Sequence, residues 1–175
     1  MITQALLFPE AIDSPAPVLR LVEAKAKASD DVEALFLEAR IAATKVLASR
    51  PVITGGAAAS KYLTHIIGHS EVEQFAVLCL TQKNAVISHA VVATGTLTEC
   101  LVHPREVFRP AILANAASVI IAHNHPSGNP SPSPADKSLT LRLKAAADII
   151  GIRLLDHVIV TGSGEYRSFV DEGLL

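Results

Sequence analysis

Two histidines and an aspartate stand close together in the sequence and are the residue types of a metal site. One residue separates His123 from His125 at the end of an apolar run, and Asp136 follows eleven residues after the second histidine. Residues two apart in a strand point to the same face, so both imidazoles can reach one point. The Pro- and Gly-rich loop that follows can fold back toward them. Two histidines and one carboxylate are a ligand set typical of a catalytic zinc, which lowers the pKa of a bound water to about 7.

A purely structural interpretation explains two of the same residues. The run from Ser133 to Asp136 has the pattern of a capping box, with Ser133 as the N-cap, Pro134 as the first helical residue and Asp136 as the third. The histidines would then be ordinary loop residues at the end of a strand. The two interpretations are compatible, because one oxygen of Asp136 can cap the helix while the other binds a metal. The conjunction of all these residues at this spacing favours the metal site.

Hydrophobic patterns predict the elements that must position these residues. We expect strands over 74–82, 85–94, 117–125 and 152–161, and helices over 29–51, 56–67, 103–116 and 133–151. Residues 95–102 are expected to form a loop or a short strand. Helices and strands alternate without a strict βαβ rhythm, which predicts an α/β (α+β) fold with a mixed sheet flanked by helices.

Composition and charge narrow the class of protein. The chain has 175 residues, of which 50% are hydrophobic and 18% are charged, so it is expected to be globular. The net charge is −2, and the Lys and Arg residues are spread along the sequence without forming a basic stripe. Both features argue against direct nucleic-acid binding by this chain alone. The sequence has neither the pattern of a secretory signal nor an apolar run of about 18 residues. We therefore expect a cytoplasmic protein that does not span a membrane.

The spacing of the candidate residues resembles a known metalloprotease motif. His123 and His125, then seven residues, Ser133, two residues and Asp136 are similar to the JAMM (MPN+) motif. The longer string HNHPSGNPSPSPAD more narrowly resembles the RadC-like JAB-domain proteins of bacteria. The strings HPREVF at 103–108, LLDHVIV at 154–160 and the ending SFVDEGLL resemble them too. The resemblance implies a JAB/MPN-type curved mixed sheet over 51–175, preceded by a helical N-terminal extension over 1–50.

The same resemblance implies a role for each site residue. His123, His125 and Asp136 match the ligands of Zn²⁺. Ser133 matches a serine that hydrogen-bonds the oxyanion developing in the transition state. Glu73, at the opening of the first strand, matches the general base that takes a proton from the zinc-activated water and passes it to the leaving amine.

Two assignments stay open on the residues alone. Nothing in the sequence by itself selects Glu73 over Glu71, Glu99 or Glu106, and Glu71 is the fallback. Asp156-His157 resembles the Asp-His pair of the family. A histidine inside an apolar strand is more often a hydrogen-bonded core residue than a group that supports a ligand or contacts substrate.

Three functions follow from these observations. The first is a zinc-dependent metallohydrolase of the JAMM type, a peptidase or isopeptidase with an unknown protein or peptide substrate. The alternative is a DNA repair or recombination accessory protein, which the RadC name suggests. The third is a non-catalytic scaffold, against which the full ligand set argues. Family members often pair through helices, so the resemblance is also compatible with a homodimer.

Overall fold

The chain divides into two units, Met1–Pro51 and Val52–Leu175. The computed structural model describes residues 32–95 and 102–175. In the first unit it describes helix α2 (Val32–Ala48), which confirms the helix expected over 29–51. Most of the extension expected over 1–50 lies outside the described residues, so its helical character stays a prediction.

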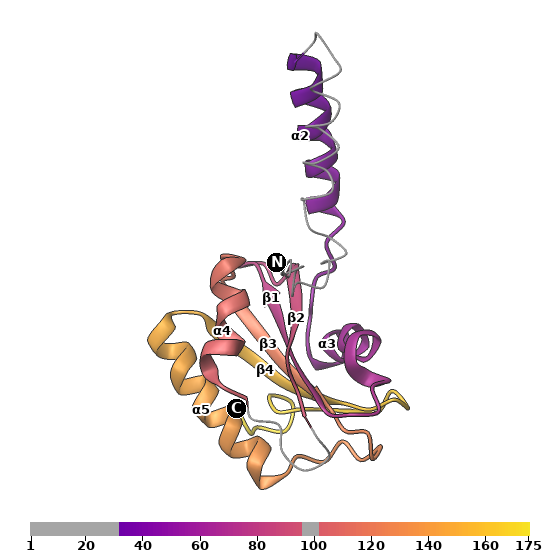
Figure 1. Ribbon diagram of the computed structural model, residues 1–175, viewed down its shortest axis with the longest axis vertical. Helices are drawn as coiled ribbons and strands as arrows, with labels where there is room; N and C mark the ends of the chain where they lie inside the picture. Colours follow the sequence, from indigo (N-terminus) through magenta and orange to yellow (C-terminus); the bar gives the residue numbers. More distant parts are fainter. Residues whose placement is uncertain (1–31, 96–101) are drawn as a thin grey trace, which may run out of the picture. The chain divides into compact units, whose positions relative to one another are not determined.

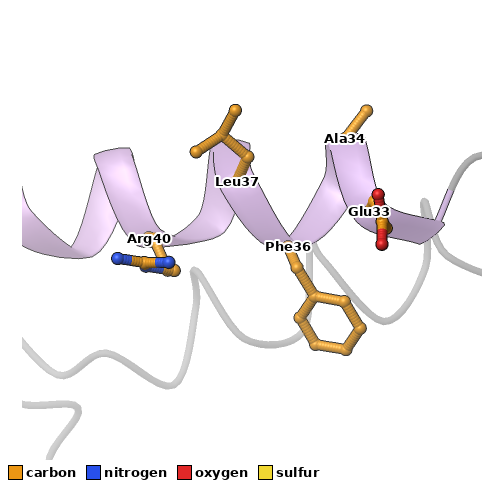
Figure 2. Close-up of a pocket in the computed structure, with 5 residues that line it drawn as sticks. All are labelled: Glu33, Ala34, Phe36, Leu37 and Arg40. Atoms are coloured by element: carbon orange, nitrogen blue, oxygen red, sulfur yellow. The ribbon is translucent and has the colours of Figure 1, made fainter.

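Helix α2 carries a surface pocket that is remote in sequence from the predicted site. Figure 2 shows Phe36 and Leu37 projecting from different sides of the helix, and both side chains are mostly exposed. Among the described residues, those that line the pocket are Glu33, Ala34, Phe36, Leu37 and Arg40. None of them belongs to the predicted metal site or its catalytic groups.

The second unit contains the predicted site. In chain order its elements are α3 (Gly56–Leu63), the π-helical turn η1 (Thr64–Gly68), β1 (Gln74–Leu80), β2 (Val86–Thr94), α4 (Pro104–Leu113), β3 (Ser118–Asn124), α5 (Pro134–Ile150), β4 (Arg153–Val160) and β5 (Tyr166–Ser168). They confirm the strands and helices expected from the sequence. Residues 96–101, within the expected loop or short strand, lie outside the described residues. No helix in the described ranges is long and apolar enough to cross a membrane.

The strands form one mixed sheet in the order β2-β1-β3-β4-β5. Strand β1 runs antiparallel to both β2 and β3, β3 is parallel to β4, and β5 is antiparallel to β4. Because parallel strands cannot be joined by a tight turn, the chain passes through α5 between β3 and β4. The crossover places the end of β3 and the beginning of α5 at the same edge of the sheet, and the mixed sheet confirms the predicted fold class.

Helices cover both faces of this sheet (Figure 1). On one face, α4 and α5 pack on the odd-numbered side chains of β1 and β3 through Val107, Phe108, Ala111, Leu143 and Ala147. On the other face, α3 and η1 contribute Ala59, Leu63 and Ile67 against the even-numbered side chains. Both clusters are mainly aliphatic. Strand β3 is buried along its whole length, so a polar side chain at its end stands in a fixed, largely dry environment.

A candidate metal site at the end of a buried strand

The two histidines leave the end of β3 on the same face. His123 pairs with Phe75 of β1 and with Ile159 of β4, and its side chain is 1% exposed. His125 lies just beyond the strand, but its N–H still donates to the carbonyl oxygen of Val160 at 3.0 Å. The strand alternation is therefore maintained. It brings the Nε2 atoms of His123 and His125 to 2.9 Å from each other.

A tight loop connects His125 to α5. Gly128 has a φ of 81°, a conformation that favours glycine, and its N–H donates to the carbonyl oxygen of His125 at 3.0 Å. The Nδ1 atom of His125 lies 2.7 Å from the carbonyl oxygen of Asn129. The side-chain oxygen of Asn129 in turn accepts from the N–H of Ser131. These contacts direct the beginning of α5 back toward the end of β3.

Helix α5 begins with the predicted capping box. The Ser133 hydroxyl accepts from the N–H of Asp136 at 3.1 Å, and the Asp136 Oδ2 atom accepts from the N–H of Ser133 at 2.7 Å. The Ser133 hydroxyl also donates to Oδ2 at 2.6 Å. The structural interpretation of Ser133 and Asp136 is thus confirmed, and it explains why these residue types occur at the helix end.

The second oxygen of Asp136 faces the histidines. Its Oδ1 atom lies 3.3 Å from His123 Nε2, and Oδ2 lies 3.9 Å from His125 Nε2. One ligand atom from each of these three residues lies within 4.8 Å of the other two, close enough for a single metal ion to bind all of them. Oδ2 accepts the hydrogen bonds of the capping box, and Oδ1 lies nearest to a histidine nitrogen, so the two interpretations are compatible.

The surroundings of Asp136 favour its ionised form. Burial by itself would raise the pKa of the carboxyl, but the adjacent His123 ring and the hydrogen bonds from Ser133 outweigh burial and hold the pKa well below its ordinary value. A carboxylate is the form that binds a metal ion.

Hydrogen bonding also assigns the proton of His125. The carbonyl oxygen of Asn129 can only accept, so His125 Nδ1 carries the hydrogen, and the neutral ring has its lone pair on Nε2. A metal-binding histidine ordinarily donates its other N–H to a carbonyl or carboxylate in this way. Two imidazole nitrogens and one carboxylate oxygen suit zinc. The residues present therefore fit a zinc ion.

Glu73 lies immediately before β1. Two residues after it, Phe75 pairs with His123 across β1 and β3, so Glu73 lies near the end of β3 that carries the histidines. Glu73 is half-buried, whereas Glu71 is exposed and two residues further from the strand. In the residues that the structure describes, no hydrogen bond joins the Glu73 carboxylate to the cluster.

Asn124 is a residue that the sequence did not single out. It is buried, and its side chain points to the face opposite the two histidines because it alternates with them. Its Oδ1 atom accepts from the N–H of Gln74 at 2.7 Å, and its Nδ2 atom donates to the carbonyl oxygens of Ser70 and Val72 at 3.1 Å each. Asn124 therefore fixes the segment that carries Glu73 against the end of β3. A polar residue between two histidines on a buried strand was the available signal.

Only one member of the Asp-His pair reaches the cluster. The buried Asp156 carboxylate accepts from the N–H groups of His157 and Val170 and from the Ser168 hydroxyl, which ties β4 to β5 and the turn after it. Burial raises the pKa of Asp156, although these hydrogen bonds partly offset the rise. His157 is fully buried, and its Nε2 atom lies 2.8 Å from His123 Nδ1. Burial holds the pKa of His157 well below its ordinary value.

Known proteins resemble this chain over the unit that contains the site. Residues 53–174 match the RadC-like JAB domain family model. The chain is 51% identical over 115 residues to a UPF0758 protein of Symbiobacterium thermophilum, which is 66% of this chain and 49% of that protein. It is 46% identical over 151 residues to a UPF0758 protein of Rubrobacter xylanophilus, covering 86% of this chain and 65% of that protein. The chain thus spans between about half and just under two thirds of the length of these relatives.

Proposed function

This chain belongs to the RadC-like JAB domain family, and from that membership and its histidine–aspartate cluster we propose that it is a zinc-dependent metallohydrolase of the JAMM type. The reaction is the hydrolysis of a peptide or isopeptide bond. The observation that carries the proposal is the convergence of His123, His125 and Asp136, with one ligand atom of each within 4.8 Å of the others. These three residues would hold the zinc ion.

The zinc ion, when bound, would polarise the scissile carbonyl and lower the pKa of the attacking water to about 7. We infer that the Glu73 carboxylate accepts a proton from that water and delivers it to the nitrogen of the leaving amine. Its position immediately before β1, two residues from the Phe75 that pairs with His123, supports this role. Water then adds its oxygen to the carbonyl carbon, the C–N bond breaks, and the amine leaves with the proton.

Ser133 would stabilise the oxyanion that forms at the carbonyl oxygen. In this structure its hydroxyl donates to Asp136 Oδ2, so it must rotate before it can donate to an oxyanion. The backbone N–H of Ser133 also donates to Oδ2 and does not depend on that rotation. The Asp136 carboxylate therefore keeps one hydrogen bond from Ser133 while the hydroxyl changes partner.

A protein or peptide is the proposed substrate, because amide hydrolysis is the chemistry that this residue set supports. The net charge of −2 argues against direct nucleic-acid binding by this chain alone. The alternative role in DNA repair or recombination rests on the family name, and a salt-dependent shift of DNA by micromolar protein would support it. A cytoplasmic location and a homodimer also stay predictions.

Metal removal tests the proposed function. We expect the full chain to cleave members of a pooled library of quenched fluorescent peptides, to lose this activity on chelation, and to regain it when zinc is restored. The control is His123→Ala, which lacks one proposed ligand and should stay inactive after zinc is added. Cleavage by zinc-loaded wild-type protein no faster than cleavage by this variant would contradict the proposal.

A further inference from the structure

A chain of hydrogen bonds connects two of the proposed ligands through the core. The His157 Nε2 atom lies 2.8 Å from His123 Nδ1, and the His157 Nδ1 atom lies 2.6 Å from the Thr140 hydroxyl. That hydroxyl lies 2.6 Å from the backbone carbonyl oxygen of Asp136, one helical turn earlier in α5. His157 and Thr140 are 0% and 1% exposed, so no bulk water competes for these bonds. Phe169 stacks on the His157 ring at a centroid distance of 4.6 Å, which fixes the plane of the ring.

The single hydroxyl proton of Thr140 determines which atom donates and which accepts in each of these hydrogen bonds. A backbone carbonyl can only accept, so the hydroxyl donates to Asp136 and must accept from His157. His157 Nδ1 therefore carries a hydrogen. The described residues offer this ring no hydrogen bond to a carboxylate, and an unpaired charge in a dry core is costly, so the ring is neutral. Its Nε2 atom then has a lone pair and accepts from His123 Nδ1.

These hydrogen bonds determine which nitrogen of His123 carries a proton. Because its Nδ1 atom carries a hydrogen and donates to His157, Nε2 is the nitrogen left to bind a metal. Nε2 is also the atom that faces His125 and Asp136. We propose that Thr140 and His157 are positioning residues that fix the tautomer and the ring orientation of His123 for zinc binding. This inference rests on the proposed zinc site.

The identity of the partner has a chemical effect of its own. Metal-binding histidines commonly donate to a carboxylate, a backbone carbonyl or water. Here the acceptor is a second, neutral imidazole, which adds no negative charge near the ion. His123 therefore stays a less basic ligand than it would be beside a carboxylate, and a bound cation keeps more of its electrophilic character. The series of hydrogen bonds begins at the backbone carbonyl oxygen of Asp136. The turn of α5 that carries the proposed ligand Asp136 therefore also orients the proposed ligand His123.

Substitution of Thr140 tests this series of hydrogen bonds without changing a proposed metal ligand. Thr140→Val keeps the shape of the side chain but removes the acceptor for His157 Nδ1. His157 can then carry its proton on Nε2, where it would oppose the Nδ1 proton of His123. We expect the zinc affinity of the full chain, measured by competition with a chromophoric chelator, to fall about 10- to 100-fold. Thr140→Ser keeps the hydroxyl and should bind zinc as the wild type does.

A second pair of variants keeps the test informative if the valine variant folds poorly. The side-chain carbonyl of glutamine can accept from His123 Nδ1, whereas leucine cannot. His157→Gln is therefore expected to bind zinc more tightly than His157→Leu. Equal affinities for wild type, Thr140→Val and His157→Leu would overturn the inference.

A readout on the metal-free full chain separates this inference from the proposed function. We expect the ¹⁵N and ¹H resonances of labelled histidine rings to show protons on Nδ1 of His157 and Nδ1 of His123. Thr140→Ser should preserve this pattern and Thr140→Val should lose it at His157. A proton on Nε2 of His157 in the wild type would overturn the inference even if zinc binds. Failure of the wild type to bind zinc would instead refute the proposed function. The positions of the ring protons would still decide whether the hydrogen bonds from Thr140 through His157 to His123 have the inferred direction.

Discussion

Glu73→Gln is expected to reduce amide hydrolysis by about 10²- to 10⁴-fold, the range that positioned general acid–base groups contribute. Glutamine has nearly the shape of glutamate but cannot accept and return a proton. The side chain is half-buried immediately before β1, two residues from the Phe75 that pairs with His123. Zinc content should be unchanged, because Glu73 is not among the residues of the cluster. Cleavage of the peptide pool and elemental analysis on the same preparation measure both effects.

The matched control is Glu71→Gln. Glu71 lies two residues earlier, is exposed, and carries the same charge, so the variant changes net charge identically. We expect its activity to match the wild type. If Glu73→Gln were fully active, or if Glu71→Gln lost activity instead, the general base would be assigned to the wrong glutamate.

Asp136→Asn is expected to weaken zinc binding by more than about 100-fold. Loss of a residue that only supports a metal ligand typically costs about 10- to 100-fold, and Asp136 is a proposed ligand itself. The helix cap should be retained. The amide oxygen can replace Oδ2 as the acceptor for the N–H and hydroxyl of Ser133. The amide nitrogen would then take the place of Oδ1, 3.3 Å from His123 Nε2, and would present hydrogens where a ligand oxygen is needed. Competition with a chelator measures the affinity, and denaturant unfolding measures the stability.

Asp136→Ala separates the two roles of this residue. It removes both oxygens, so it should lose zinc and also lower the free energy of unfolding by about 1 kcal/mol through loss of the capping box. The asparagine variant should lose zinc with little change in metal-free stability. An asparagine variant that binds zinc as tightly as the wild type would leave Asp136 with the capping role alone.

The candidate ligands could be predicted because each depends on local sequence. The alternation of a strand places His123 and His125 on one face, and the capping box fixes Asp136 at the beginning of α5. Gly128, within a Pro- and Gly-rich loop, provides the positive φ that lets the chain turn back. Spacing along the chain was therefore sufficient for the geometry of the three ligand atoms.

The supporting residues could not be predicted because they come together only through tertiary packing. Thr140 meets His157 where α5 packs on β4, and these residues are 17 apart in sequence. Asn124 hydrogen-bonds Gln74 at the beginning of β1, and the two residues are 50 apart in sequence. Glu73 was selected by resemblance, and the antiparallel pairing of Phe75 with His123 is what brings the segment before β1 to the end of β3. The hydrophobic patterns of strands and helices, which repeat every two and every three to four residues, do not indicate contacts between residues so far apart in sequence.

The most direct test of the zinc site is the amount of zinc per chain, determined by elemental analysis of full-length protein purified without chelators, with His123→Ala prepared in parallel. We expect close to one zinc per chain in the wild type and its loss in the variant, because His123 contributes one of the proposed ligand atoms. The absence of zinc from both proteins, or equal zinc in both, would contradict a zinc site formed by His123, His125 and Asp136.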